Sequence, residues 1–571
     1  MEPDKRIEQL LTTYLVRDNH AASDYFGLIR ELLQVKMTNP SAQTYIDQVY
    51  GLVEDEIISN QGLPVNEINF GTSGWRGTLG KDVFLKSVGS VTEAIVDLYK
   101  LADSDPDLHP HLGVNSFEEA RQRGCLVGWD NRFGGEILGR CVADTLLKHG
   151  FKVYFCGEST TGVLSASLLE LQAAFSVNLT PSHNPLDYGG YKYNAADGGP
   201  AASQLTSFIT DKSRERIDGA AEIETVGISG GGELIEIDSF ALWQQLVDSS
   251  KEVHRIDYRA LIEQVADHPD MEVVIDSVHG ASRLHIKRLL GPAVNKLEHL
   301  RGEPDVTFGG IAPEPSSKNM SKVTERLQKS RKNLKIGAII DPDADRIRFT
   351  DGTSEISMNQ FGAMAYHFLH EYKKLNGMVA KTVATSNLAN SVAATLGEEL
   401  FETKVGFKEF KPVIGKALVY FEESDGISVI GHTPEKDAYI GLLLALDMVV
   451  ATGRNLSEIK RQMDDIYGEF YPDRDGVLVS LKGDDLLKAL AGLEKYEVGS
   501  TVKVGSREKT IKEIISKDGR KMIFEDDSWL MIRPSGTEPK VRFYVESRDP
   551  DGTTLLVEAA KSMLSEIGLL D

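Results

Sequence analysis

Cysteine is rare in this sequence. The 571 residues include three cysteines, Cys125, Cys141 and Cys156. Three are too few for a disulfide framework, and their spacing does not match a zinc site. We therefore expect a protein of the reducing cytoplasm.

Long apolar runs are also missing. The longest, residues 439–446, ends at Asp447 and is far shorter than the roughly 20 residues that cross a bilayer. The N-terminus, MEPDKRIEQLL, lacks the basic start and apolar core of a secretory signal. The sequence thus predicts no membrane segment and a cytoplasmic location.

Basic residues are in deficit, with 63 Lys and Arg against 86 Asp and Glu and a net charge of −23. Such a chain repels phosphate backbones and anionic lipids unless basic residues gather locally, so we expect no nucleic-acid partner. A small anionic ligand would need a cleft that collects Arg and Lys. The oligomeric state is left open.

The length and the pattern of the chain predict several domains, because one core rarely serves 571 residues. Helical spacing of apolar residues between Arg6 and Glu56 predicts a helical N-terminal extension. Plain packing is its simplest role, and an oligomer contact or a lid are alternatives. The predicted boundaries are 1–65 for this extension, 66–235, 236–350, 351–470 and 471–571.

Beyond Gly71 the pattern is that of an α/β protein. Short runs rich in Val and Ile end in polar or glycine-bearing loops and are followed by helical stretches, as in CLVGWDNR, MEVVIDSVHG and KIGAIIDPDADR. Ligands of open α/β sheets bind at the carboxyl ends of such strands. The loops there are the place to look for chemistry.

One such loop, residues 178–193, reads NLTPSHNPLDYGGYKY. Pro181 and Pro185 prevent a helix and hold Ser182 on a rigid corner. By itself, a serine in an Asn-Pro turn is usually only a turn.

A second loop, DPDADR, follows an apolar strand. Asp341, Asp343 and Asp345 alternate, so that their carboxylates project to one side and offer oxygen ligands for Mg²⁺. An EF-hand is excluded, because its sixth position is Arg346 rather than Gly and its twelfth is Gly352 rather than Glu. A solvated acidic turn is the alternative.

Two further loops offer polar groups. Residues 533–546, RPSGTEPKVRFYVE, combine an arginine fork with a Ser-Gly-Thr turn that can present N–H groups and hydroxyls to one phosphate. In FEESDGI, Glu422 and Ser424 point to the same side and can hold sugar hydroxyls, and Lys436 lies in the following TPEKDA. Taken separately, residues 533–546 could be an ordinary hairpin turn, and the other two segments could be ordinary charged loops.

Taken in order, the loops resemble the α-D-phosphohexomutases, the phosphoglucomutase and phosphomannomutase superfamily. The motifs are GTSGWRG at 71–77, TPSHNP with Lys192 beyond it, DPDADR, GFK at 406–408, EES at 422–424 and RPSGTEPK. The resemblance extends from about Ile68 to the C-terminus. EESDG and DYGGYKYNAADGG resemble the phosphoglucomutase branch most.

This resemblance implies a four-domain architecture of three related α/β domains and a smaller C-terminal α+β domain. The active cleft would lie at their junction. It also implies a phosphoserine enzyme that gives its phosphoryl group to a sugar phosphate, with glucose 1,6-bisphosphate as intermediate and activator and Mg²⁺ as cofactor.

The resemblance assigns roles residue by residue. Ser182 would carry the phosphoryl group and would bind Mg²⁺ through it, together with Asp341, Asp343 and Asp345. His183, Lys192, Arg76, Arg346 and Lys436 complete the predicted catalytic set, with Lys436 as the general acid/base whose pKa nearby cations would lower. The predicted substrate-binding residues are Gly406, Phe407, Lys408, Glu422, Ser424, Arg533, Ser535, Gly536, Thr537 and Arg542.

Some residues depart from the family pattern. Ala344 replaces the usual central glycine of the metal loop, which is harmless at negative φ and strained otherwise. Pro181 and Ala438 replace a common alanine and glycine, and Phe421 and Asp425 stand where many members carry glycine. These changes leave the chemistry intact and bear on sugar preference.

The predicted reaction is the interconversion of glucose 1-phosphate and glucose 6-phosphate. Mannose and pentose phosphates are alternative substrates, since epimer choice depends on a few hydrogen bonds. A non-catalytic sugar-phosphate binding protein is an alternative of another class. A phosphatase with Asp341 as nucleophile is a third, which would keep its activity without Ser182.

Overall fold

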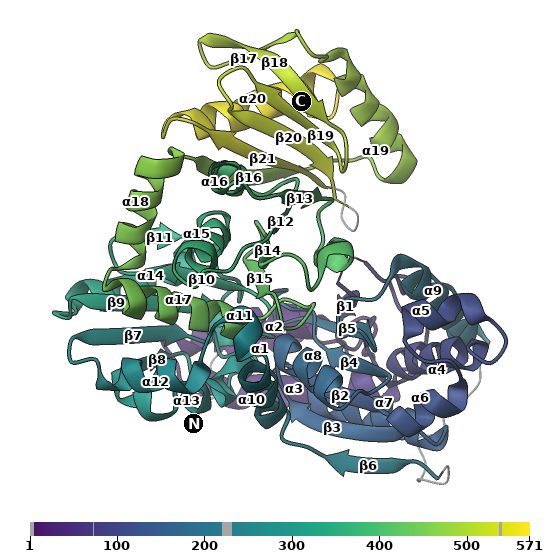
Figure 1. Cartoon of the computed structure of the whole chain (residues 1–571). Helices are drawn as coiled ribbons and strands as arrows, with labels where there is room; N and C mark the ends of the chain where they lie inside the picture. The colour runs from purple at the N-terminus through teal and green to yellow at the C-terminus, as the bar shows by residue number, and fades with distance from the viewer. Residues whose placement is uncertain (1–4, 72, 220–230, 536–539, 571) are drawn as a thin grey trace.

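The computed structural model describes residues 5–71, 73–219, 231–535 and 540–570. Four β-sheets follow one another along the chain, the first three mixed and covered by helices and the fourth antiparallel (Figure 1). The predicted class, three α/β domains and a smaller C-terminal α+β domain with a helical extension before them, is confirmed. The domain boundaries stay predictions.

The N-terminal extension forms three helices, α1 (Lys5–Tyr14), α2 (Tyr25–Lys36) and α3 (Ala42–Ser59). Their apolar residues share one core with the first sheet and its helices. The buried Glu56 of α3 pairs with Lys81 at 2.6 Å. The extension is therefore a packing element of the first sheet's layer, and the oligomer and lid roles gain no support from these contacts.

The first sheet has the strand order β1-β5-β4-β2-β3-β6. Its central strands β4, β2 and β3 run parallel, and β5 joins β4 antiparallel. The strands are β1 (Trp75–Thr78), β2 (Cys125–Trp129), β3 (Lys152–Glu158), β4 (Phe175–Leu179), β5 (Tyr188–Ala195) and β6 (Glu233–Glu236). The helices are η1 (Pro106–Leu108), α4 (Leu85–Leu101), α5 (His109–Leu112), α6 (Phe117–Arg123), α7 (Gly135–Lys148), α8 (Thr161–Glu170) and α9 (Ser203–Asp218).

The second sheet has the order β11-β10-β9-β7-β8, with β7 parallel to both β8 and β9. Its strands are β7 (Met271–Asp276), β8 (Leu297–Leu300), β9 (Leu334–Ile340), β10 (Ile347–Thr350) and β11 (Glu355–Ile356). Around it lie α10 (Ser239–Ser249), α11 (Lys251–His254), α12 (Tyr258–Asp267), η2 (Ala281–Leu284), α13 (Ile286–Leu290), η3 (Gly291–Lys296), η4 (Phe308–Gly310) and α14 (Ser317–Lys329).

The third sheet has the order β13-β12-β14-β15 and again ends in an antiparallel hairpin, β14–β15. Its strands are β12 (Val379–Thr382), β13 (Leu400–Thr403), β14 (Val419–Glu422) and β15 (Gly426–Val429). Its helices are α15 (Met358–Glu371), α16 (Leu388–Leu396), η5 (Phe407–Val413), α17 (Ala438–Thr452) and α18 (Leu456–Tyr467).

The α17 helix is apolar on all sides because it is buried between the second and third sheets, with which it shares one core. In the described residues no single helix is long and apolar enough to cross a membrane. By length and composition, α17 and α18 pass that test only as a pair bent by 79°.

The C-terminal sheet, at the top of Figure 1, has the order β16-β21-β20-β19-β18-β17 and a core of its own. Its strands are β16 (Tyr471–Leu478), β17 (Thr501–Val504), β18 (Arg507–Ile515), β19 (Arg520–Phe524), β20 (Trp529–Pro534) and β21 (Lys540–Ser547). Its helices are α19 (Gly483–Leu490), η6 (Ala491–Lys495) and α20 (Gly552–Glu566).

Candidate active site

Ser182 lies on a corner directly after β4, as the two prolines predict. Its backbone has φ = 58°, the left-handed region that few residues other than glycine adopt. The corner is held by Thr180, whose hydroxyl accepts the Ser182 N–H at 2.9 Å. The Ser182 hydroxyl donates to Asp341 Oδ2 at 2.8 Å across 159 positions of sequence. The serine corner and the acidic loop therefore meet.

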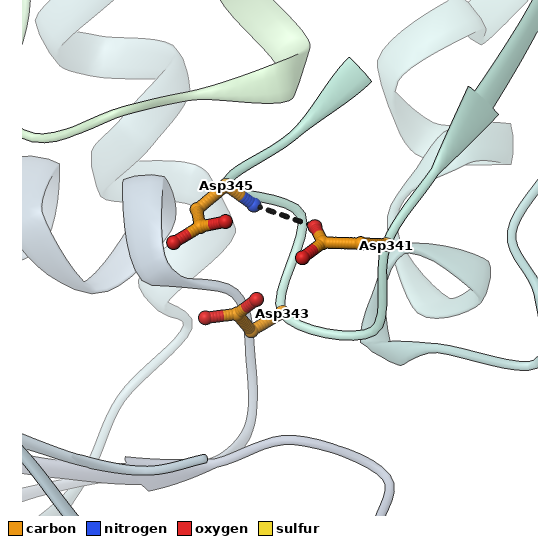
Figure 2. Close-up of side chains that lie close together, drawn as sticks. All are labelled: Asp341, Asp343 and Asp345. Atoms are coloured by element: carbon orange, nitrogen blue, oxygen red, sulfur yellow. Dashed lines mark hydrogen bonds between the residues drawn. The ribbon is translucent and has the colours of Figure 1, made fainter. Parts of the chain in front are cut away.

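The acidic loop connects β9 and β10 and brings three buried carboxylates together. One oxygen each of Asp341, Asp343 and Asp345 lies within 4.8 Å of the others, and Figure 2 shows the side chains turned toward a common space. The backbone N–H of Asp345 donates to Asp341 Oδ1 at 3.1 Å, which tightens the loop. Ala344 has φ = 52°, the left-handed region that favours glycine, so of the two cases expected for this residue the strained one applies.

The chemistry of these ligands fits a hard divalent cation. Asp343 Oδ1 is buried and has no hydrogen-bond partner among the described residues, an arrangement that costs free energy unless a cation completes it. Burial and the neighbouring Asp343 and Asp345 carboxylates raise the pKa of Asp341 well above its usual value. Three carboxylates buried side by side therefore need compensating positive charge.

Lys192 supplies part of that charge. Its Nζ lies 2.5 Å from Asp343 Oδ2 and 2.8 Å from Asp345 Oδ2. Burial alone would lower the pKa of Lys192, but Asp343 and Asp345 raise it overall, so the amine is charged. Burial likewise acts to raise the pKa of Asp345, and Lys192, Lys436 and Arg346 hold it well below its usual value instead.

The other predicted catalytic residues also lie near the acidic loop or the serine corner. Arg346 Nε lies 3.6 Å from Asp345 Oδ1. Arg76 on β1 donates to Asn184 Oδ1 at 2.9 Å, beside the serine corner. His183 Nδ1 lies 3.4 Å from Ser182 Oγ, and burial, together with Arg346 and Arg76, lowers its pKa well below the usual value. His183 is therefore neutral.

The prediction for the pKa of Lys436 was wrong in sign. We expected nearby cations to lower it, but the Nζ lies 3.4 Å from Asp345 Oδ2, 3.7 Å from Glu435 Oε1 and 4.0 Å from Glu422 Oε1. Burial acts to lower the pKa, and these carboxylates outweigh it and raise the pKa. The amine is protonated in this arrangement.

Two of the predicted sugar-binding residues, Glu422 and Phe407, lie beside Lys436. Glu422 ends β14, and the Ser424 hydroxyl donates to its Oε1 at 2.7 Å. The Phe407 ring lies 5.4 Å from Lys436 Nζ. Gly406 precedes it with φ = 127°, a conformation that favours glycine. Lys408 instead reaches the first domain, where its Nζ donates to Ser203 Oγ at 2.8 Å.

The predicted phosphate loop belongs to the C-terminal sheet. Arg533 on β20 lies opposite Arg542 on β21, so the two guanidiniums share one face. The Nε of Arg533 lies 2.9 Å from Asp518 Oδ2, and Ser535 N donates to Lys540 O at 2.8 Å. The predicted Gly536 and Thr537 lie outside the described residues.

Some residues at the site were not predicted from the sequence. The Thr161 hydroxyl, at the start of α8, donates to Asp343 Oδ2 at 2.7 Å. Asp437, next to Lys436, accepts from Trp243 Nε1 at 2.6 Å and lies 2.7 Å from His432 Nε2. Arg132 donates to the carbonyl of Ser182 at 2.7 Å. These contacts span 182, 194 and 50 positions, so no local motif signals them.

Family models match this chain along most of its length, in the order expected. They are described as phosphoglucomutase/phosphomannomutase α/β/α domain I at residues 111–218, domain II at 251–354, domain III at 357–467 and the C-terminal domain at 479–561. The fold and the site thus define a phosphohexomutase. The chain belongs to the phosphoglucomutase/phosphomannomutase superfamily and is an enzyme of the mutase class.

Relatives with different named substrates are about equally similar. A phosphoglucomutase/phosphomannomutase of Thermococcus kodakarensis is 26% identical over 78% of this chain and 91% of its own. A phosphoglucosamine/phosphogalactosamine mutase of Sulfurisphaera tokodaii is 24% identical over 87% and 98%. A crystal structure from Thermus thermophilus, named as a phosphomannomutase, is 26% identical with a TM-score of 0.68, covering 88% of this chain and 99% of that one.

Proposed function

We propose that this protein interconverts glucose 1-phosphate and glucose 6-phosphate through a phosphoserine at position 182. The observation that carries the proposal is the 2.8 Å contact between the Ser182 hydroxyl and Asp341 within a cluster of three buried carboxylates. A hydroxyl held there can carry a phosphoryl group between charged partners on both sides. The glucose preference is based on the EESDG loop.

Asp341, Asp343 and Asp345 would hold Mg²⁺, which when bound supplies positive charge to the transferring phosphoryl group. Arg76, Lys192 and Arg346 would add fixed positive charge around the same group. Because His183 is neutral, it can orient the serine oxygen without adding charge.

In each half-reaction one P–O bond breaks and one forms. In the first, phosphorus leaves the Ser182 oxygen and bonds to a sugar hydroxyl oxygen; the hydroxyl loses its proton and the serine oxygen gains one. In the second, phosphorus leaves the other phosphorylated sugar oxygen and bonds to the Ser182 oxygen, and the protons move in the opposite sense. The protonated Lys436 is suited to the acid half of this exchange, and once neutral it can take up the proton that the attacking hydroxyl releases. Glucose 1,6-bisphosphate is then the intermediate, which reorients in the site and returns its other phosphoryl group to Ser182.

The remaining predicted contacts position the sugar phosphate. Glu422 and Ser424 would accept and donate hydrogen bonds to sugar hydroxyls, while Gly406, Phe407 and Lys408 would border one side of the ring. The guanidiniums of Arg533 and Arg542 would hold the phosphate that is not transferred, with Ser535, Gly536 and Thr537. We also propose a cytoplasmic location, supported by three free cysteines.

The test is intact-mass measurement after incubation with glucose 1,6-bisphosphate and Mg²⁺. We expect one added phosphoryl group on the wild-type chain and none on Ser182→Ala, together with loss of mutase activity in a coupled assay. A chain that gains nothing covalent is a binding protein, and release of inorganic phosphate that survives Ser182→Ala identifies a phosphatase with another nucleophile. Turnover of mannose 1-phosphate or a pentose 1-phosphate tenfold above glucose 1-phosphate would overturn the glucose assignment.

A further inference from the structure

We propose that Arg132 is a positioning residue that fixes the corner carrying Ser182. It follows β2, at the end of the run CLVGWDNR, and no role was predicted for it from the sequence. Its guanidinium donates to four backbone carbonyls of the serine loop, at Ser182, Asn184, Pro185 and Tyr188. This inference deepens the proposed function and rests on it only for the activity measurements.

The four contacts hold the loop on both sides of its turn. Arg132 Nη2 donates to Ser182 O at 2.7 Å and also to Asn184 O. Nη1 donates to Pro185 O at 2.5 Å and to Tyr188 O at 3.4 Å. A planar fork of N–H donors is the side chain that can serve several carbonyls at once, whereas a lysine ammonium is a single compact charge.

Asp130 and Phe308 restrain the guanidinium of Arg132 itself. Its side chain is 4% exposed, and its Nε lies 3.4 Å from Asp130 Oδ2. Its central carbon lies 4.8 Å from the Phe308 ring of the second domain. A buried charge with these partners has little freedom, so the carbonyls that it binds are held in place as well.

Asp130 links the same guanidinium to Ser182 by a second route. Its Oδ2 accepts from the Thr180 hydroxyl at 2.7 Å, and that hydroxyl accepts the Ser182 N–H at 2.9 Å. The carbonyl and the N–H of Ser182 are therefore both restrained by one buried network. Such restraint is needed, because a left-handed serine with φ = 58° costs free energy that its surroundings must offset.

The chain offers a matched control in Arg123, at the opposite end of β2. Its guanidinium donates to the carbonyls of Gln172 at 2.7 Å, Gly113 at 2.5 Å and Ala173 at 3.2 Å. Arg123 is likewise a fork that serves several carbonyls, with a side chain 27% exposed against 4% for Arg132, and none of these carbonyls belongs to the serine loop. Arg123→Lys therefore reports the general cost of losing such a fork.

The experiment compares Arg132→Lys with Arg123→Lys by amide hydrogen exchange and steady-state kinetics on the full chain. In Arg132→Lys, amides of residues 180–188 should exchange at least about tenfold faster, since hydrogen bonds from a charged donor are lost. Amides of residues 113 and 172–174 should keep their rates. Arg123→Lys should give the reverse pattern.

The kinetics should separate positioning from simple destabilisation. We expect kcat of Arg132→Lys to fall about 100-fold with KM within about threefold, because a displaced serine slows transfer more than substrate binding. Arg123→Lys should keep kcat. Where Arg132→Lys does not fold, Arg132→Gln, which keeps a planar pair of N–H donors, takes its place.

Unchanged exchange of residues 180–188 in the Arg132 variant overturns the proposal, and so does an equal fall of kcat in both variants. A wild-type chain that does not act on any sugar phosphate contradicts the proposed function instead. The exchange measurement decides the positioning role in that case too.

Discussion

Single residues at the site adopt backbone conformations that their side chains disfavour. Ala344 has φ = 52° in the acidic loop, and Asp425, which follows β14, has φ = 71°. Glycine adopts this region without strain, whereas a side chain with a Cβ atom makes it less favourable. An alanine held in this region is strained by roughly 1 kcal/mol.

Ala344→Gly should therefore leave the thermal midpoint of unfolding nearly unchanged. The relief of about 1 kcal/mol of strain offsets the 0.5 to 1 kcal/mol, roughly, that the greater freedom of unfolded glycine costs. The buried Ala338 on the neighbouring strand β9 provides the control, because Ala338→Gly relieves no such strain and should lower the midpoint. Equal losses in the two variants, measured by calorimetry, would show that Ala344 is not strained.

At the scale of elements, the start of α8 in the first domain is tied to the metal loop of the second. The Thr161 N–H donates to Asp343 O at 2.8 Å, and its hydroxyl donates to Asp343 Oδ2 at 2.7 Å. The same hydroxyl accepts from Asn178 Nδ2 at 3.0 Å. If Asp343 binds a metal ion as proposed, these hydrogen bonds would orient its carboxylate.

Thr161→Val should weaken divalent-cation binding about tenfold, because the shape is kept and the hydroxyl that orients Asp343 is lost. Titration calorimetry with Mg²⁺ and Mn²⁺ measures this without reference to activity. Thr145→Val is the control: its hydroxyl is also buried, but donates within α7 to Cys141 O at 2.8 Å. A Thr161 variant with the affinity of the Thr145 variant would contradict the role.

The start of α8 also shows which residues of the site could not be predicted from the sequence. A strand followed by DPDADR, or a proline-framed Ser182, is a local pattern, and the structure places both groups together as the family resemblance implied. Thr161 and Arg132 follow strands too, but an isolated threonine or arginine carries no signal until the fold brings it to its partner. The predicted direction of the Lys436 pKa shift was wrong because the sequence places Asp345, Glu422 and Lys436 in one site without giving the distances that decide whether carboxylates or cations lie nearest to the amine.

At the scale of the whole molecule, the third and fourth sheets meet at a buried pair of lysines. Lys521 on β19 donates to Val383 O at 2.9 Å and lies 4.0 Å from the Trp529 ring. Lys381 on β12 pairs with Glu402 Oε2 at 2.9 Å, while Lys521 is 3.9 Å from the same oxygen. Two buried amines thus share one nearby carboxylate.

Burial and the charge of Lys381 lower the pKa of Lys521 to about 7, although Glu402, Glu546 and Glu513 act to raise it. The unfolded chain keeps a lysine pKa of about 10.4. Between these values the unfolded state binds more protons than the folded state, so this lysine makes stability rise as pH rises from about 7 to about 10. Below pH 7, roughly, its contribution is constant.

Lys521→Met should therefore remove part of the increase in thermal midpoint between pH 7 and pH 10, roughly the window that the two pKa values define. Because the amine lies 4.0 Å from the Trp529 ring, its deprotonation should also change tryptophan fluorescence with a midpoint near pH 7. That titration should vanish in Lys521→Met and in Trp529→Phe, and it should persist in Lys503→Met, an exposed lysine of the same sheet. A fluorescence titration that persists in Lys521→Met would show that another group titrates near the tryptophan. A pH dependence of the thermal midpoint that is unchanged in Lys521→Met would show that Lys521 does not contribute to stability in this pH range.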